Sequence, residues 1–101
     1  MHRYLKVSEV VTQLHVDANL LNVLATQEVI HLKPSSEGDL VISAEDVERV
    51  RTAMVLMDEL DVNLAGVEVI MHMRDSMLAL QHQVSEILDA LVEEMRHKLP
   101  R

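Results

Sequence analysis

Hydrophobic residues recur at helical spacing along the C-terminal part of the chain. Asn63 precedes this stretch and is a suitable N-cap, because its side-chain oxygen can accept a hydrogen bond from a free amide of a first helical turn. The spacing places side chains on one face of a helix and is typical of a coiled-coil seam. The pattern predicts a long helix after Asn63, either continuous or interrupted near Asp75 and Ser76. The stripe itself, at 3-4 spacing, comprises Ile70, Met73, Met77, Leu80, Val84, Ile87 and Leu91.

Two short segments near the N-terminus predict a pair of helices. Ser8 is the candidate N-cap of the first, and Asp17 is the candidate N-cap of the second. Because only a few residues separate them, the two helices form a helix-turn-helix. The expected buried positions are Val7, Val10, Val11 and Leu14 in the first helix and Leu20, Leu21 and Leu24 in the second.

A small hairpin and a third helix follow. Residues 29–32 read as a strand, residues 34–39 as a turn and residues 40–42 as the return strand, which together predict a two-strand wing. Ser43 with Asp46 three residues later predicts a capped helix that continues to residues 58–60. The fold class is therefore all-α, a winged helix-turn-helix with a small two-strand wing and a long C-terminal coiled-coil helix. The third helix is expected to face the core through Val47, Val50, Met54, Met57 and Leu60.

Length and composition predict one compact domain with an extension. We expect a winged helix-turn-helix domain over residues 1–75 and a C-terminal dimerisation helix over residues 76–101, because a chain of 101 residues is near the lower size at which a core folds alone. Tyr4 is the only aromatic residue, so the core is aliphatic. No apolar run reaches the length of a membrane span and the first residues lack a signal-peptide pattern, which predicts a cytoplasmic protein.

The C-terminal half of the apolar stripe is the candidate dimer interface. No other long helix is available in the chain to cover it, which favours a homodimer, either parallel or antiparallel, over packing within the chain. The interface residues we expect are Met77, Leu80, Val84, Ile87 and Leu91.

Negative charge dominates the sequence and suggests the chemistry of a partner. Seventeen acidic residues against nine basic ones give a formal net charge of −8, and no lysine or arginine occurs from Val7 through Leu32. Such a surface repels phosphate and attracts basic partners. The acids around the third helix also fit a solvated face with helix caps, so both interpretations stay open. The candidate partner-binding residues are Glu45, Glu48, Asp58, Glu59 and Asp61, with Asp17 as a second surface.

No pattern predicts a catalytic, cofactor or metal site. Gly38 and Gly66 are the only glycines, so a glycine-rich phosphate loop is absent, and cysteine is absent too. His82 and Glu86 have helical spacing, as do His72 and Asp75, but two ligands do not make a zinc site. We therefore expect neither enzymatic activity nor a cofactor.

Three segments resemble the MerR superfamily of winged helix-turn-helix proteins. Residues 4–10, YLKVSEV, resemble the opening of the family, and residues 43–50, SAEDVERV, resemble the start of its post-wing helix. Residues 60–70, LDVNLAGVEVI, are similar to the signature of its heat-shock-repressor and chaperone-modulator branch.

The departures from the DNA-binding members bear on function. Those members carry basic or aromatic residues after the second helix and in the wing, which neutralise phosphates and reach base edges. Here residues 21–28 read LNVLATQE and residues 35–39 read SSEGD, without lysine or arginine. The chain thus resembles the chaperone-modulator (CbpM-type) family, whose members bind and restrain the J-domain of a DnaJ-like co-chaperone. J-domains present a basic helix, which an acidic surface complements. The alternative is a DNA-binding transcriptional regulator.

Overall fold

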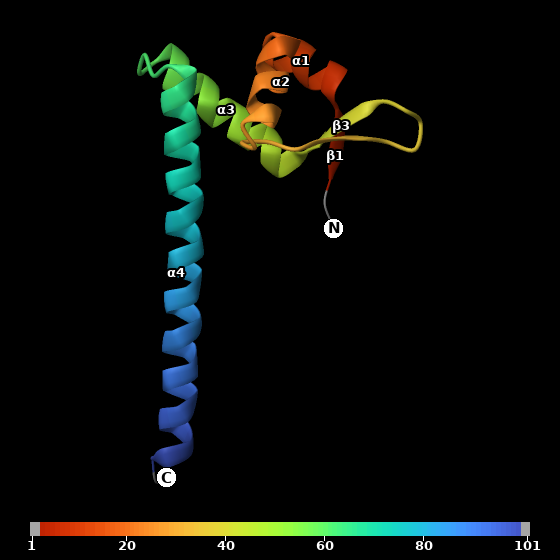
Figure 1. The fold of residues 1–101 in the computed structure, drawn as a ribbon. Coiled ribbons are helices and arrows are strands. Elements are labelled where there is room, and N and C mark those ends of the chain that lie inside the picture. Colours follow the sequence, from red (N-terminus) through yellow and green to blue (C-terminus); the bar gives the residue numbers. More distant parts are fainter. Residues whose placement is uncertain (1–2, 100–101) are drawn as a thin grey trace. The chain divides into compact units, whose positions relative to one another are not determined.

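The computed structural model describes residues 3–99, which form four helices and three short strands (Figure 1). The chain divides into two compact units, the first ending at Met71 and the second beginning at His72. The division that we predicted after residue 75 stays a prediction. The elements in order are β1 (Tyr4–Lys6), α1 (Val7–Leu14), α2 (Ala18–Thr26), β2 (Leu32–Pro34), β3 (Leu40–Ser43), α3 (Ala44–Asp58) and α4 (Leu64–Lys98).

Three of the four predicted helix caps are confirmed. The Asn19 amide donates to Asp17 Oδ1 at 2.9 Å, and the Asp46 amide donates to Ser43 Oγ at 3.1 Å. The Gly66 amide donates to Asn63 Oδ1 at 2.8 Å. Each bond satisfies an amide that has no partner within its own helix, so the side chains fix where α2, α3 and α4 begin.

The predicted cap at Ser8 is wrong. Helix α1 begins at Val7, two residues earlier than a cap at Ser8 predicts, and its N-cap position is Lys6, whose side chain makes no capping hydrogen bond. Lys6 is also the last residue of β1, so the strand leads directly into the helix. The pairing of β1 with β3 therefore sets the start of α1, in place of a polar side chain.

The sheet has three antiparallel strands in the order β1-β3-β2, one strand more than predicted. Leu5 and Leu32 both pair with Ile42, which is fully buried. The expected strand over residues 29–32 is also wrong, because β2 begins only at Leu32. The amides of Val29 and Ile30 instead donate to the Leu24 carbonyl and close the end of α2.

An aliphatic core holds the first unit together. Fully buried side chains come from α2, the segment before β2, β3, α3 and the start of α4, among them Leu21, Leu24, Ile30, Ile42 and Met71. In α1 only Val10 is fully buried, while Val7, Val11 and Leu14 pack against the core from its edge. In α3, Val47 and Val50 are buried as predicted, whereas Met54 and Met57 are only partly so.

Leu60 does not face the core. Its side chain is 63 % exposed, because α3 ends at Asp58 and the chain turns before α4. Asp61 adopts the left-handed conformation in this turn, with φ of 54°. The Val62 amide then donates to the Leu56 carbonyl at 2.9 Å and closes the helix end. The apolar spacing of α3 thus continues two residues beyond the end of the helix.

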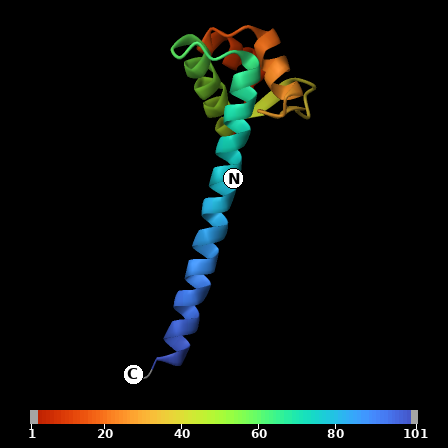
Figure 2. The same cartoon turned by 60° about the vertical axis from the view of Figure 1, so that its left-hand side comes forward.

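Helix α4 is a single element from Leu64 to Lys98, without an interruption at Asp75 and Ser76 (Figure 2). Its first turns supply Val67 and Met71 to the core of the first unit. The side chains of the second unit, up to Leu99, are almost all exposed.

Replacing Asn63 with Ala is expected to lower the free energy of unfolding by about 1 kcal/mol, because the Gly66 amide loses its capping acceptor. Asn63→Asp keeps that acceptor and adds a negative charge at the helix N-terminus, so it should stay within ~0.5 kcal/mol of the wild type. Urea denaturation followed by circular dichroism measures both variants. Equal losses for the two variants would show that the loss does not come from the capping hydrogen bond.

Candidate functional site

The predicted acidic residues gather on α3 and the turn after it. Glu45, Glu48 and Asp58 lie on the helix, Glu59 occupies its C-cap, and Asp61 lies in the following turn. All five are exposed. The structure thus brings five of the six acids to one element and its end.

Asp17 lies apart from this group and has a structural role. Its carboxylate accepts the Asn19 amide at 2.9 Å and caps α2. The exposed positions of α2 next to it are uncharged, with Asn19, Asn22 and Thr26 spaced three and four residues apart on one face. The α2 surface is therefore neutral apart from the cap.

The outer face of α3 combines carboxylates with an exposed aliphatic side chain. Glu45, Glu48, Thr52, Val55 and Glu59 follow 3-4-3-4 spacing, which places them on one side of the helix. Val55 is 45 % exposed on this face. We call this surface the acidic α3 face.

The acids of this face differ in their partners. Glu48 Oε1 lies 3.3 Å from Arg51 Nε, so its charge is partly offset by a neighbour on the same helix. Within residues 3–99, no ion pair involves Asp58, Glu59 or Asp61. α3 also carries no basic residue in its last turn, where the helix dipole contributes partial negative charge. The negative potential is therefore strongest at the C-terminal end of α3.

Asp46 has a structural task that the sequence did not reveal. Its Oδ2 accepts the His31 amide at 2.8 Å, and Arg49 lies beside it with Nε 4.0 Å from Oδ1. Arg49 Nε in turn donates to the Val29 carbonyl at 2.6 Å. This clamp ties the segment before β2 to α3, so it holds the fold and does not belong to the acidic α3 face.

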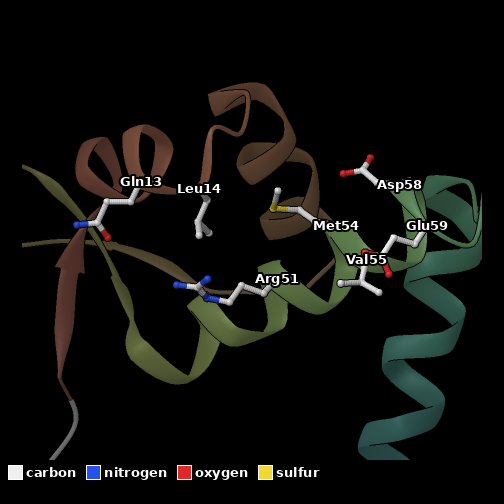
Figure 3. Close-up of a pocket in the computed structure, with 7 residues that line it drawn as sticks. All are labelled: Gln13, Leu14, Arg51, Met54, Val55, Asp58 and Glu59. Atoms are coloured by element: carbon white, nitrogen blue, oxygen red, sulfur yellow. The ribbon is translucent and has the colours of Figure 1, made fainter.

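A groove borders the acidic α3 face (Figure 3). It lies between the end of α1 and α3 and has a volume of about 500 Å³. Leu14 and Met54 form its apolar part, and both pack against the core on their inner side. The residues that line it are Gln13, Leu14, Arg51, Met54, Val55, Asp58 and Glu59. This groove was not predicted from the sequence, because its walls come from helices far apart in the chain.

Most lysine and arginine side chains within residues 3–71 are engaged with neighbouring groups. Lys6 Nζ lies 3.6 Å from Asp39 Oδ2, and Lys33 Nζ lies 4.0 Å from the centroid of the Tyr4 ring. Arg49 and Arg51 make the contacts already described. Few cations are thus presented near the helix-turn-helix, where a phosphate backbone would need them.

The predicted dimer residues are exposed on α4. More than half of the surface is exposed in Met77, Leu80, Ile87 and Leu91, and 47 % is exposed in Val84. A second apolar series, at 4-3-4 spacing, was not predicted from the sequence. It comprises Leu88, Val92, Met95 and Leu99, each of which is about half exposed. The apolar face therefore widens toward the C-terminal end of the helix.

Histidines on α4 pair with carboxylates along the helix. His82 Nε2 lies 2.8 Å from Glu86 Oε1, and His97 Nε2 lies 3.3 Å from Glu93 Oε1, both at i,i+4 spacing. Among the described residues, no group of three or more histidines, aspartates and glutamates is placed to hold a metal ion. Nor is any helix of the described part long and apolar enough to cross a membrane.

A tight helix pair followed by a hairpin and further helices defines a helix-turn-helix domain. Comparison with protein families matches residues 5–88 to the MerR HTH family of regulatory proteins, and the chain belongs to this family. No curated protein and no solved structure matches the chain.

Proposed function

We propose that this protein is a chaperone modulator that binds the J-domain of a DnaJ-like co-chaperone and restrains it. The observation that carries the proposal is the acidic α3 face together with the adjacent Asp58. Asp58 and Glu59 are exposed and form no ion pair within residues 3–99. A basic helix of a J-domain complements such a surface in charge. The restraint follows from the resemblance to chaperone modulators: a J-domain whose basic helix is covered is unable to engage its heat-shock chaperone.

The helix-turn-helix itself supports a role other than reading DNA. α1 and α2 carry no lysine or arginine, and the nearby Lys6 and Lys33 contact Asp39 and Tyr4. Neutralising phosphates is the main source of affinity for DNA. A domain with this charge distribution is better suited to a basic protein partner.

The activity assay for this proposal measures chaperone ATP hydrolysis stimulated by the co-chaperone. Adding this protein should suppress the stimulated rate in a saturable way and leave the basal rate unchanged. An undiminished stimulated rate at saturating protein would refute the restraint.

A DNA-binding transcriptional regulator is the second candidate, favoured by the family match and by the exposed Asn19, Asn22 and Thr26 of α2. Asparagine and threonine side chains hydrogen-bond to base edges in the major groove. Electrophoretic retention of upstream DNA at low and moderate salt separates the two functions. Sequence-selective retention at about 0.1 M salt would favour the regulator.

We also propose a homodimer formed through Met77, Leu80, Val84, Ile87 and Leu91. The support is the exposed apolar face of α4, because single helices in water rarely leave so wide a stripe uncovered. A second copy of the same helix has a matching stripe at the same spacing.

A further inference from the structure

The groove between α1 and α3 has the features of a side-chain socket (Figure 3). Leu14 and Met54 supply an apolar lining, and both pack against the core. Val55 stands at the edge with 45 % of its surface exposed. A volume of about 500 Å³ admits an anchoring aliphatic side chain from a partner.

The charges around the groove are unevenly distributed. Arg51, toward one end in Figure 3, is offset by Glu48 at 3.3 Å. Asp58 and Glu59, two helical turns further along α3, have no such partner among the described residues. The helix dipole adds negative potential at this end. A cation is therefore attracted specifically to the Asp58 end of the groove.

This arrangement works against the stability of α3 itself. Acidic residues at a helix C-terminus interact unfavourably with the dipole, and α3 has no basic residue in its last turn to compensate. Residues that lower the stability of a fold are expected at functional sites. The Asp58–Glu59 pair fits this expectation.

The charge of the protein also restricts what occupies the groove. A second copy would bring a further net charge of −8, and a nucleic acid would bring phosphates to the acidic end. A basic helix meets both requirements, because a helix places an apolar and a cationic side chain on one face at three- or four-residue spacing.

We propose that the groove is the docking seat of a positively charged amphipathic helix. The helix inserts an aliphatic side chain against Met54 and places a lysine or arginine, one turn away, beside Asp58 and Glu59. The inference rests on the proposed function, since it assigns the basic helix of the J-domain to this particular surface.

Two variants separate the apolar and the charged parts of the groove. Val55→Thr keeps the shape but removes apolar surface, so dissociation should become roughly three- to tenfold faster with little change in association rate. Asp58→Lys with Glu59→Lys should slow association about tenfold at low salt and flatten its salt dependence. The double variant should also melt at a higher temperature than the wild type, because the dipole clash is removed.

The control is Glu28→Lys with Glu37→Lys, which makes the same change in net charge at exposed positions outside the groove. Association and dissociation of an isolated J-domain are followed by surface plasmon resonance on the full chain at two salt concentrations. The control should keep most of the wild-type association rate.

The outcomes distinguish failure of the proposed function from failure of the docking seat alone. No binding by the wild type overturns the proposed function and the docking seat together. Wild-type binding that the groove variants leave unchanged, or that the control weakens as much as they do, overturns the docking seat and leaves the proposed function standing.

Discussion

Replacing both Leu80 and Ile87 with Asp is expected to convert a dimer into a monomer. These side chains lie on the apolar face of α4, and each is about 60 % exposed in the single chain. In a dimer they would be covered by the partner helix, and burying an unpaired carboxylate costs several kcal/mol, of the order that separates dimer from monomer. Sedimentation equilibrium at tens of micromolar measures the change directly, since a dimer with a Kd of about 1 μM persists there.

The matched control carries the same two charges on the other side of the helix. This control combines Ala79→Asp with His82→Asp. Both positions lie outside the 3-4 stripe, so the dimer should survive these changes. A monomeric wild type at the same concentration would contradict the dimer, and equal dissociation of both double variants would show that negative charge alone, and not the stripe, governs assembly.

Arg49→Ala is expected to lower the free energy of unfolding by about 2–3 kcal/mol. The guanidinium donates to the Val29 carbonyl at 2.6 Å and lies beside Asp46, while the two side chains are only 20 % and 14 % exposed. Its loss leaves the carbonyl of the fully buried Val29 without this donor. It also leaves the mostly buried carboxylate of Asp46 without this cation.

Arg51→Ala is the natural comparison, because this arginine is two residues away on the same helix but half exposed. Its single surface ion pair with Glu48 contributes little, so the loss should stay within ~0.5 kcal/mol. Chemical denaturation of both variants decides the matter, and similar losses would mean that the clamp between α3 and the segment before β2 does not support the fold.

Helix beginnings were predictable from the sequence where a side chain makes the cap. Asp17, Ser43 and Asn63 each accept an amide two or three residues ahead, a contact that depends only on local spacing. The start of α1 depends on the pairing of β1 with β3, about forty residues away. The cap predicted at Ser8 was therefore wrong. Local chemistry identifies a cap, but tertiary pairing can move the element that it would begin.

The positions of the strands could not be predicted from local sequence either. Val29 and Ile30 have strand-like side chains, yet their amides close α2 and Arg49 holds the Val29 carbonyl. Residues 4–6 form a strand only because Ile42 offers its second edge to Leu5. Neither arrangement has a periodic signal in the sequence.

The acidic residues of the candidate site could be chosen from charge and spacing, but their roles could not. Asp46 belongs to a structural clamp, Asp17 to a cap, and Glu48 to an ion pair, whereas Asp58 and Glu59 are left exposed beside a groove. The groove exists because α1 and α3 each supply a wall, with Leu14 and Met54 lining it from positions 40 residues apart in the chain. Tertiary packing thus decides which of several similar carboxylates is available to a partner.

Isothermal titration of the purified protein with an isolated J-domain measures directly whether the two bind. At about 50 mM salt we expect saturable binding of one J-domain per protomer. At about 500 mM salt we expect weaker binding, because screening reduces the attraction between exposed charges. Absence of binding at the lower salt, together with sequence-selective retention of promoter DNA by the same preparation, would contradict the account and identify a DNA-binding regulator.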